Sequence, residues 1–280
     1  ASAWESAIKS IANIQYNRFS KGHELLVLGQ LDVSQEMEEV KDLDFSVIQD
    51  RKKLSDTVVK IDMEVAHIIC TIVKSGKIPI VIGGGHNNAY GNIKGTALAK
   101  GKPINAINFD AHSDFRILEG RHSGNGFSYA FEEGFLGKYF IFGLHENYTS
   151  KKVLTTIKKI YNRVRFNTYD EIAIRRQKNF DEEMAKSFAF ISGDCFGIEI
   201  DLDAIPLSAE AMAYGSDRAA RLRAASAGDD YALLFTASLP PPQVTDRVTR
   251  IGQIVRAPGL QLVDAQGPVP LPERLGWLHG

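Results

Sequence analysis

Two clusters of possible metal ligands follow apolar runs in the first half of the chain. His86 comes directly after the three glycines that end the run 78–82, and Asp110, His112 and Asp114 follow the run 104–109. Histidine and carboxylate together suit a borderline or hard divalent cation rather than a soft one. Ligands of an α/β sheet bind where strands end at its carboxyl edge, so we expect both clusters at the same rim.

The alternation of residue types in Asp110-Ala111-His112-Ser113-Asp114 is informative in itself. In an extended segment it would place the three ligands on one side, with Ala111 and Ser113 facing away. The alternative is a polar loop with a chance histidine, which is less consistent with an apolar run that ends in the core. We therefore interpret the segment as a ligand cluster.

A third apolar run, 195–200, ends in Asp201-Leu202-Asp203. Alternation again puts both carboxylates on one side, although such a pair alone is more often a turn or a helix cap. Together with the first two clusters it gives six ligands, which are too many for one ion of ordinary geometry. They suit two cations about 3.5–4 Å apart that lower the pKa of a bridging water. The predicted chemistry is hydrolysis at an electrophilic carbon.

The elements that must position these ligands alternate along the chain. We expect strands at 24–33, 78–82, 104–109, 139–144, 163–167 and 195–205, and helices at 54–72, 93–100, 153–161 and 180–190. Apolar strand interiors between helices are typical of a parallel, helix-covered sheet. The fold class is α/β.

Composition excludes several classes of function for this 280-residue chain. Hydrophobic residues are 44% and charged residues 24%, with a net charge of −1, so neither nucleic acid nor an anionic membrane is an expected partner. Cys70 and Cys195 cannot form a disulfide framework, which favours a reducing, cytoplasmic compartment. We expect no membrane span and no signal peptide.

The motifs GGGH, DAHSD and DLD resemble the three metal motifs of the ureohydrolase family, which contains arginase, agmatinase and formimidoylglutamase. The resemblance covers about residues 1–203. It implies a three-layer α/β/α parallel sheet of the arginase type, truncated by loss of its first strand and of its last strand and helix. It also implies two Mn²⁺ per chain. One would be held by His86, Asp110, Asp114 and Asp201, the other by Asp110, His112, Asp201 and Asp203, with Asp110 and Asp201 bridging and thereby catalytic.

The loop RHSGN, residues 121–125, matches the family segment that binds the amino-acid end of the substrate. The resemblance makes His122, Ser123 and Asn125 candidate substrate-binding residues, while an ordinary turn is the alternative. Arginase carries a histidine two residues after that asparagine, where this chain has Phe127. The pattern looks more like formimidoylglutamase.

The chain changes character after residue 203. Every lysine and asparagine lies before Ala204, and eight of the ten prolines lie after it. The segments GDDYALLFT (228–236) and GWLHG (276–280) resemble the carboxyl-terminal part of thiamine-monophosphate kinase, and strand-like order is expected at 231–236 and 259–264. We expect two domains, a ureohydrolase-like 1–203 and a foreign α+β segment 204–280, so that the chain reads as a chimera.

Three functions follow from these observations. The first is a manganese hydrolase of linear amidines, converting formimidoylglutamate to glutamate and formamide in histidine degradation. The second is a metal-binding but inactive hybrid, and the third is a kinase-related protein of thiamine diphosphate biosynthesis. The expected partner is a small-molecule substrate. A sheet edge left uncovered would also allow a second copy of the chain to pair with it and form a homo-oligomer. The sequence contains no P-loop, so no nucleotide-binding motif supports the third, kinase-related function.

Overall fold

The computed structural model describes residues 8–9, 11–15, 18, 22–44, 46–201, 262–264 and 267–269. The chain divides into two compact units, Ala1–Asp229 and Asp230–Gly280. The expected domain boundary at 203/204, the ligand Asp203 and the expected strand 231–236 all lie outside the described residues.

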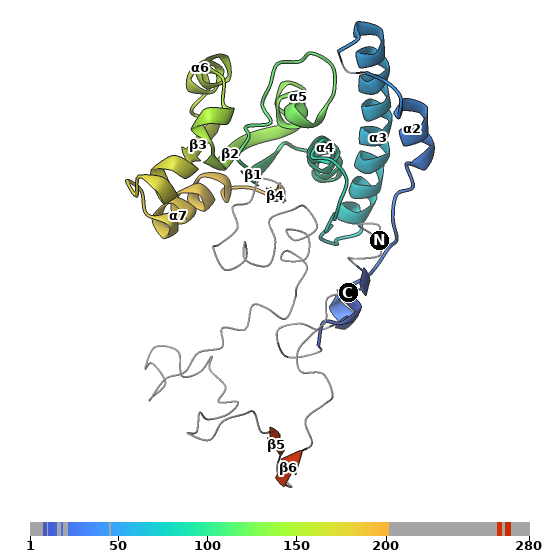
Figure 1. Ribbon diagram of the computed structural model, residues 1–280, viewed down its shortest axis with the longest axis vertical. Helices are drawn as coiled ribbons and strands as arrows, with labels where there is room; N and C mark the ends of the chain where they lie inside the picture. Colours follow the sequence, from blue (N-terminus) through green and yellow to red (C-terminus); the bar gives the residue numbers. More distant parts are fainter. Residues whose placement is uncertain are drawn as a thin grey trace. The chain divides into compact units, whose positions relative to one another are not determined.

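A four-stranded parallel sheet forms the centre of the first unit (Figure 1). The strand order is β3-β2-β1-β4, and all three pairs are parallel. Parallel neighbours need a crossover, and helices supply it here. The strands are β1 (Ile104–Phe109), β2 (Leu136–Leu144), β3 (Val164–Thr168) and β4 (Phe196–Ile200).

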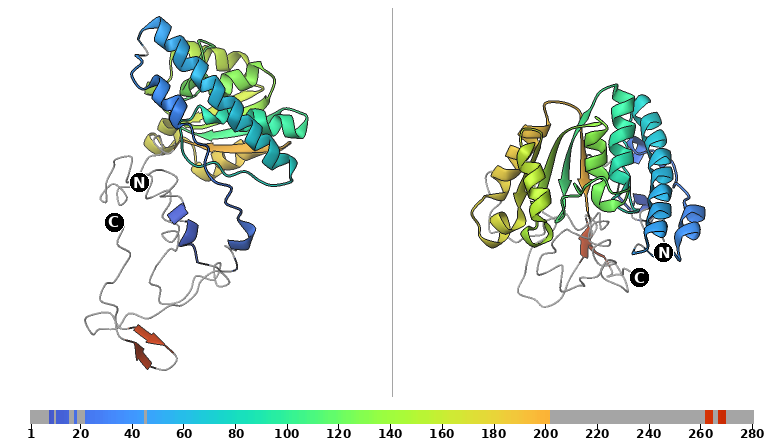
Figure 2. Two further views of the ribbon diagram at one scale, coloured as in Figure 1. Left: turned by 90° about the vertical axis from the view of Figure 1, so that its right-hand side faces the viewer. Right: turned by 90° about the horizontal axis from the view of Figure 1, so that it is seen from above.

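Helices cover both faces of this sheet (Figure 2). One apolar cluster joins Ala106 and Ile141 of the sheet to Ile93 and Ala130 of the helices α4 and α5. A second cluster joins Ile107, Phe140 and Phe142 to Phe190 and Ile191 of α7. The consecutive residues Ala106 and Ile107 of β1 thus pack against helices on opposite faces of the sheet. This arrangement confirms the predicted α/β fold with helix layers on both sides. The helices are α2 (Ser34–Val40), α3 (Ile48–Lys74), α4 (Asn88–Lys100), α5 (Gly126–Glu132), α6 (Lys151–Lys159) and α7 (Phe180–Ile191).

The long helix α3 packs on the outside of α4, and two glycines of α4 permit the close approach. A Cβ at Gly95 would lie 2.5 Å from the carbonyl oxygen of Ala66, and one at Gly91 would lie 2.7 Å from Cγ1 of Val65. Both distances are well below van der Waals contact, so only glycine fits. The packing brings α3 close to the segment that carries the candidate site.

Two of the expected strands are wrong. Residues 25–33 and 77–82 are assigned to no strand or helix, and their apolar side chains are exposed, including Leu26 at 73%, Ile78 at 89% and Ile80 at 75%. An apolar run forms a strand only where a neighbouring strand accepts its backbone hydrogen bonds. Among the described residues the sheet ends at β4, which leaves neither run a partner.

The other expected strands and helices up to residue 201 are confirmed, with ends shifted by a few residues, while 202–205 of the expected strand 195–205 lie outside the described residues. In the second unit, the described residues form an antiparallel pair, β5 (Leu262–Asp264) and β6 (Gly267–Val269), and β5 falls within the expected strand-like segment 259–264. None of the helices in the described part of the chain is both long and apolar enough to cross a bilayer.

Candidate metal centre

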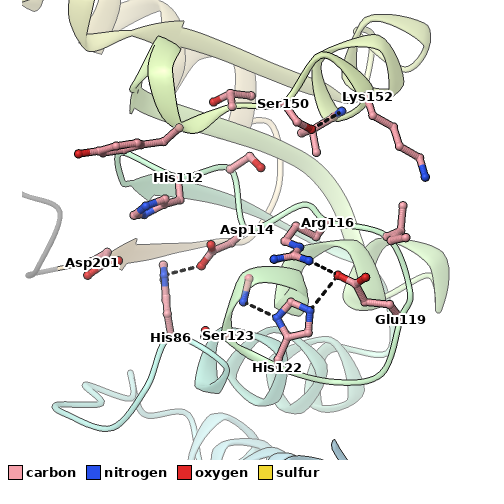
Figure 3. Close-up of a pocket in the computed structure, with 16 residues that line it drawn as sticks. His86, His112, Asp114, Arg116, Glu119, His122, Ser123, Ser150, Lys152 and Asp201 are labelled. Atoms are coloured by element: carbon pink, nitrogen blue, oxygen red, sulfur yellow. Dashed lines mark hydrogen bonds and ion pairs between the residues drawn. The ribbon is translucent and has the colours of Figure 1, made fainter. Parts of the chain in front are cut away.

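The predicted ligands meet at the carboxyl edge of the sheet (Figure 3). Asp110 follows β1, Asp201 follows β4, and the register of the two strands pairs Phe109 with Ile200. The backbone N–H of Asp201 also donates to the carbonyl of Phe109 at 3.1 Å. The two aspartates therefore leave adjacent strands at the same level, while His86 approaches from the turn before α4.

Five of the six predicted metal ligands fall into two overlapping groups. His86, Asp110 and Asp114 form one group, and Asp110, His112 and Asp201 form the other, with the ligand atoms of each group within 4.8 Å of one another. Asp110 belongs to both groups, which is the position required of a bridging ligand. Asp203, the sixth, lies outside the described residues.

His86 makes close contacts to two carboxylates. Its Nδ1 lies 2.8 Å from Oδ2 of Asp114 and 3.2 Å from Oδ2 of Asp110. Burial alone would lower the pKa of His86, but the interactions with Asp110 and Asp114 outweigh burial and raise the pKa to about 10. Burial and the like charge of Asp110 raise the pKa of Asp114 in turn.

A divalent cation fits this donor set. Both ring nitrogens of His86 are buried without a hydrogen-bond partner, and Nδ1 has only its close contacts to the carboxylates of Asp114 and Asp110. Buried polar atoms are nearly always satisfied, so an orphaned pair beside carboxylate oxygens points to a missing partner. Imidazole with carboxylate is a ligand set used by Mn²⁺ and Zn²⁺.

Two buried residues that the sequence reasoning missed orient Asp110. Nδ2 of Asn108 donates to Oδ2 of Asp110 at 3.0 Å and to the hydroxyl of Tyr139 at 3.2 Å. Tyr139 donates to the carbonyl of Ser113 at 2.9 Å, and burial raises the pKa of its hydroxyl well above 10. The available signal was an asparagine inside an apolar strand, where an amide needs partners.

Asp114 also departs from ordinary backbone geometry. Its φ of 42° lies in the left-handed region, a conformation it shares with one other described non-glycine residue. Aspartate tolerates this region better than most residues, and such strain concentrates at functional sites. The turn directs the Asp114 carboxylate back toward His86 (Figure 3).

The loop 121–125 lies beside this cluster, and its predicted residues take different positions. Ser123 lines the cavity, whereas Asn125 is fully buried. Oδ1 of Asn125 accepts hydrogen bonds from Nη1 of Arg121 at 2.6 Å and from the N–H of His122 at 3.0 Å, and its Nδ2 donates to the carbonyl of Gly120. The side chain of Asn125 thus holds the loop and does not line the cavity.

His122 lines the cavity but is engaged within the loop. Its Nδ1 accepts from the N–H of Gly124 at 3.1 Å, so the proton sits on Nε2, which lies 3.4 Å from Oε1 of Glu119. Burial and the nearby charge of Arg116 lower the pKa of His122 against the opposing effect of Glu119. A neutral imidazole that fixes the loop is the consequence.

A cavity of about 630 Å³ opens onto the ligand cluster. His86, His112 and Asp201 lie at one end, and Lys152 and Glu119 lie toward the other, with Arg116 between them (Figure 3). Arg116 pairs with Glu119 at 2.5 Å. Lys152 forms no ion pair with the described residues, so its charge is uncompensated in the cavity wall.

Phe127, which stands where the resemblance to arginase would place a histidine, is fully buried beneath the cluster. Its ring stacks on Tyr139 at 4.3 Å and meets the ring of His86 edge-on at 5.7 Å. The position thus contributes an apolar floor to the site, and no hydrogen bond to a ligand can come from it.

The parallel α/β fold and the shared histidine–carboxylate cluster at its carboxyl edge define a domain suited to binding divalent metal. The model of the arginase family matches residues 10–211, and the chain belongs to this family. That match includes the loop 121–125 and all six predicted ligands.

Individual relatives match over shorter stretches. The formimidoylglutamase of Streptococcus pyogenes serotype M3 is 31% identical over 135 residues, which is 43% of this chain and 41% of that protein. The crystal structure of formimidoylglutamase from Bacillus subtilis is similar at 24% identity and a TM-score of 0.46, covering 52% of this chain and 46% of that one. The crystal structure of a variant of Trypanosoma cruzi formiminoglutamase with Mn²⁺ has 22% identity and a TM-score of 0.46, covering 51% of this chain and 48% of that one. The chain spans less than half the length of these relatives.

Proposed function

We propose that this chain hydrolyses a C–N bond of linear amidines and that its substrate is formimidoylglutamate. Water adds to the formimidoyl carbon, the bond from that carbon to the glutamate nitrogen breaks, and a proton goes to the leaving amine. The products are glutamate and formamide, as in histidine degradation. The observation that carries this proposal is the pair of ligand groups that share Asp110 at the wall of the cavity.

His86, Asp110, Asp114 and Asp201 would hold one Mn²⁺, and Asp110, His112, Asp201 and Asp203 would hold the other. Metal ions so held supply a nucleophilic water at neutral pH. Around them the chain's own residues limit where the substrate lies. Tyr148, which lines the cavity, stacks on His112 with ring centroids 5.2 Å apart, while the buried Phe127 supports His86 from below by an edge-on ring contact.

The cavity wall supports a substrate with two carboxylates. Ser123 offers a hydroxyl, and Arg116 and Lys152 offer positive charge at and beyond the middle of the cavity (Figure 3). Glu119 offsets Arg116, and the lowered pKa of His122 leaves its ring neutral. The wall outside the ligand cluster is thus net positive, which favours formimidoylglutamate over the cationic arginine or agmatine.

The discriminating experiment is release of formamide from formimidoylglutamate, with and without Mn²⁺, by the protein first stripped with chelator. Metal-dependent formamide is the expected result. Faster release of urea from arginine would show that the substrate assignment is wrong, and formamide release that persists without metal would contradict the use of manganese.

A metal-binding protein without turnover is the second candidate, and one observation favours it. The segment 77–82 that leads to His86 has no strand pairing and is exposed, so the position of His86 depends on few contacts upstream. Metal uptake without formamide release would support this candidate.

We also propose that residues 204–280 form a separate segment without kinase activity. The support is the change in composition after residue 203 and the lack of a nucleotide-binding motif. ATP-dependent phosphorylation of thiamine monophosphate by the purified chain would contradict this division and support the kinase-related alternative.

A further inference from the structure

Arg121 lies in the interior between three segments that are distant in sequence. The residue is 4% exposed, and its carboxylate partner, Asp62 of α3, is 0% exposed. Nε of Arg121 donates to Oδ2 of Asp62 at 2.8 Å. A buried guanidinium is stable only when its charge is paired and its N–H groups are hydrogen-bonded. The partners of its other N–H groups therefore help to hold it in place.

The remaining donors of Arg121 reach the two segments that build the site. Nη2 donates to the carbonyl of Asn87 at 3.1 Å, in the turn directly after His86. Nη1 donates to the carbonyl of His122 at 3.0 Å and to Oδ1 of Asn125 at 2.6 Å, both in the loop beside the cavity. One guanidinium therefore ties the turn that carries His86 to the loop that carries Ser123.

Two aromatic rings pack against this guanidinium, and a hydroxyl holds the backbone of the same residue. Its carbon lies 4.8 Å from the ring centroid of Tyr90 and 5.2 Å from that of Tyr129. The backbone N–H of Arg121 donates to Oγ of Ser55 at 2.6 Å, which attaches the loop to α3 a second time. A planar fork held in this way cannot be reproduced by the single ammonium of lysine.

We propose that Arg121 is a positioning residue that holds the His86 turn and the loop 122–125 at a fixed separation. It touches neither the cavity nor any metal ligand directly, and it acts through the Asn87 carbonyl and through Asn125. This role is needed because the segment upstream of His86 has no strand partner in the described part of the chain, so the turn is held from its downstream side. Asp62 keeps the guanidinium in place.

The test replaces Arg121 by lysine, which keeps the charge opposite Asp62 but loses the fork. The expected result is faster hydrogen exchange in peptides covering both 84–88 and 122–126, together with Mn²⁺ affinity lower by roughly 10–100-fold, the usual cost of losing a group that orients a ligand. The matched control is Arg163→Lys. Arg163 also donates to two backbone carbonyls, of Leu136 and Gly137, and its guanidinium carbon lies 4.1 Å from the ring centroid of Phe131. None of these partners lies in 84–88 or 122–126.

Unchanged exchange in either segment of Arg121→Lys, or equal effects of Arg163→Lys on exchange at the site, would overturn the inference. If Arg121→Lys does not fold, Asn125→Ala is the second variant. It removes one acceptor of Arg121 Nη1, together with the side-chain bonds of Asn125 to His122 and Gly120 inside the loop. The inference then requires faster exchange in 84–88, a segment with which Asn125 shares no hydrogen bond.

The manganese measurement rests on the proposed function, whereas the exchange measurement does not. A wild-type protein that takes up no divalent metal would contradict the proposed function and still leave the exchange comparison to decide the role of Arg121. Normal metal uptake by wild type with undisturbed exchange in Arg121→Lys would contradict the positioning role alone.

Discussion

Asn108 and Asp110 lie on the same side of one strand end, and Nδ2 of Asn108 donates to Oδ2 of Asp110 at 3.0 Å. Replacing Asn108 by alanine removes an amide donor that fixes that oxygen, so Mn²⁺ affinity should fall by roughly 10–100-fold. Titration calorimetry measures it.

Asn105 provides the control for this change, because it is a buried asparagine of the same strand. It bonds the carbonyl of Ile191 and the N–H of Lys138, at the opposite end of β1. Asn105→Ala should lower stability and leave metal affinity unchanged. Equal affinity losses in the two variants would contradict an orienting role for Asn108.

Metal uptake should release a proton from His86. The carboxylates that surround this ring raise its pKa to about 10 despite burial, so it is protonated at pH 7.5, whereas a metal ligand must be neutral. About one proton should leave per chain, and affinity should rise roughly tenfold per pH unit between pH 7 and 9. Calorimetry in two buffers of different ionisation enthalpy measures the release, and heats that do not depend on the buffer would contradict it.

The same shift has the opposite consequence for the metal-free protein. Because the folded pKa of His86 exceeds the ordinary value of 6.5, the folded state binds the proton more tightly than the unfolded state. The stability gained from this is fully present below about pH 6.5 and is lost as the pH rises toward 10. Urea midpoints of chelator-treated wild type and His86→Asn should therefore converge as the pH rises.

Loss of Asp110 should cost more metal than loss of His86. Asp110 belongs to both ligand groups, whereas His86 belongs to one. Asp110→Asn should therefore abolish uptake of both ions, and His86→Ala should leave one ion partly bound. Elemental analysis after gel filtration gives the stoichiometry. Two ions per chain in Asp110→Asn would show that the shared position of this carboxylate is not a bridge.

Phe127→Ala should destabilise the protein by about 3–5 kcal/mol, the usual cost of removing a fully buried phenylalanine side chain. The ring is 0% exposed and stacks on Tyr139. Phe180→Ala is the control, because Phe180 is 52% exposed and should cost much less. Urea unfolding measures both, and similar midpoints for the two variants would contradict the packing role of Phe127.

Lys152→Met should weaken the preference for a substrate with two carboxylates. Lys152 lines the cavity without an ion partner among the described residues, whereas its neighbour Lys151 does not line it. KM for formimidoylglutamate should rise roughly fivefold, about 1 kcal/mol for an exposed ion pair, while KM for the γ-amide analogue should not change. Lys151→Met should change neither value, and an equal effect on both substrates would exclude a role for the charge.

The four strands of the sheet and the four long helices could be predicted because their periodicity is local. Runs such as 104–109 alternate faces between two helix layers, and that pattern is written in consecutive residues. The runs 24–33 and 78–82 have the same apolar composition, and there the prediction was wrong. A strand also needs a neighbour, and whether one is present depends on residues elsewhere in the chain.

The candidate site divides in the same way. His86, Asp110, His112, Asp114 and Asp201 could be predicted because each follows an apolar run and because their types suit metal. Tyr139 and Arg121 could not, because their partners are distant in sequence and become visible only when α3, α4 and β2 pack together. Asn108 was missed although its partner Asp110 is two residues away, and an asparagine inside an apolar strand was the available signal. Asn125 is the clearest example of what the sequence does not reveal. Its position in the loop 121–125 predicted a substrate-binding residue, whereas in the structure its side chain forms hydrogen bonds within the loop and does not line the cavity.

The edge of β4 opposite β1 has no partner among the described residues, and Phe196, Ile198 and Ile200 along it are 37–52% exposed. Alternation directs the backbone groups of these three residues outward, because those of Cys195 and Asp201 bond to β1. Such an edge is a template for another chain, and collisions between two chains grow with the square of concentration. Two preparations of identical sequence, one stored dilute and one stored concentrated, would therefore differ in the fraction of chains that remain monomeric.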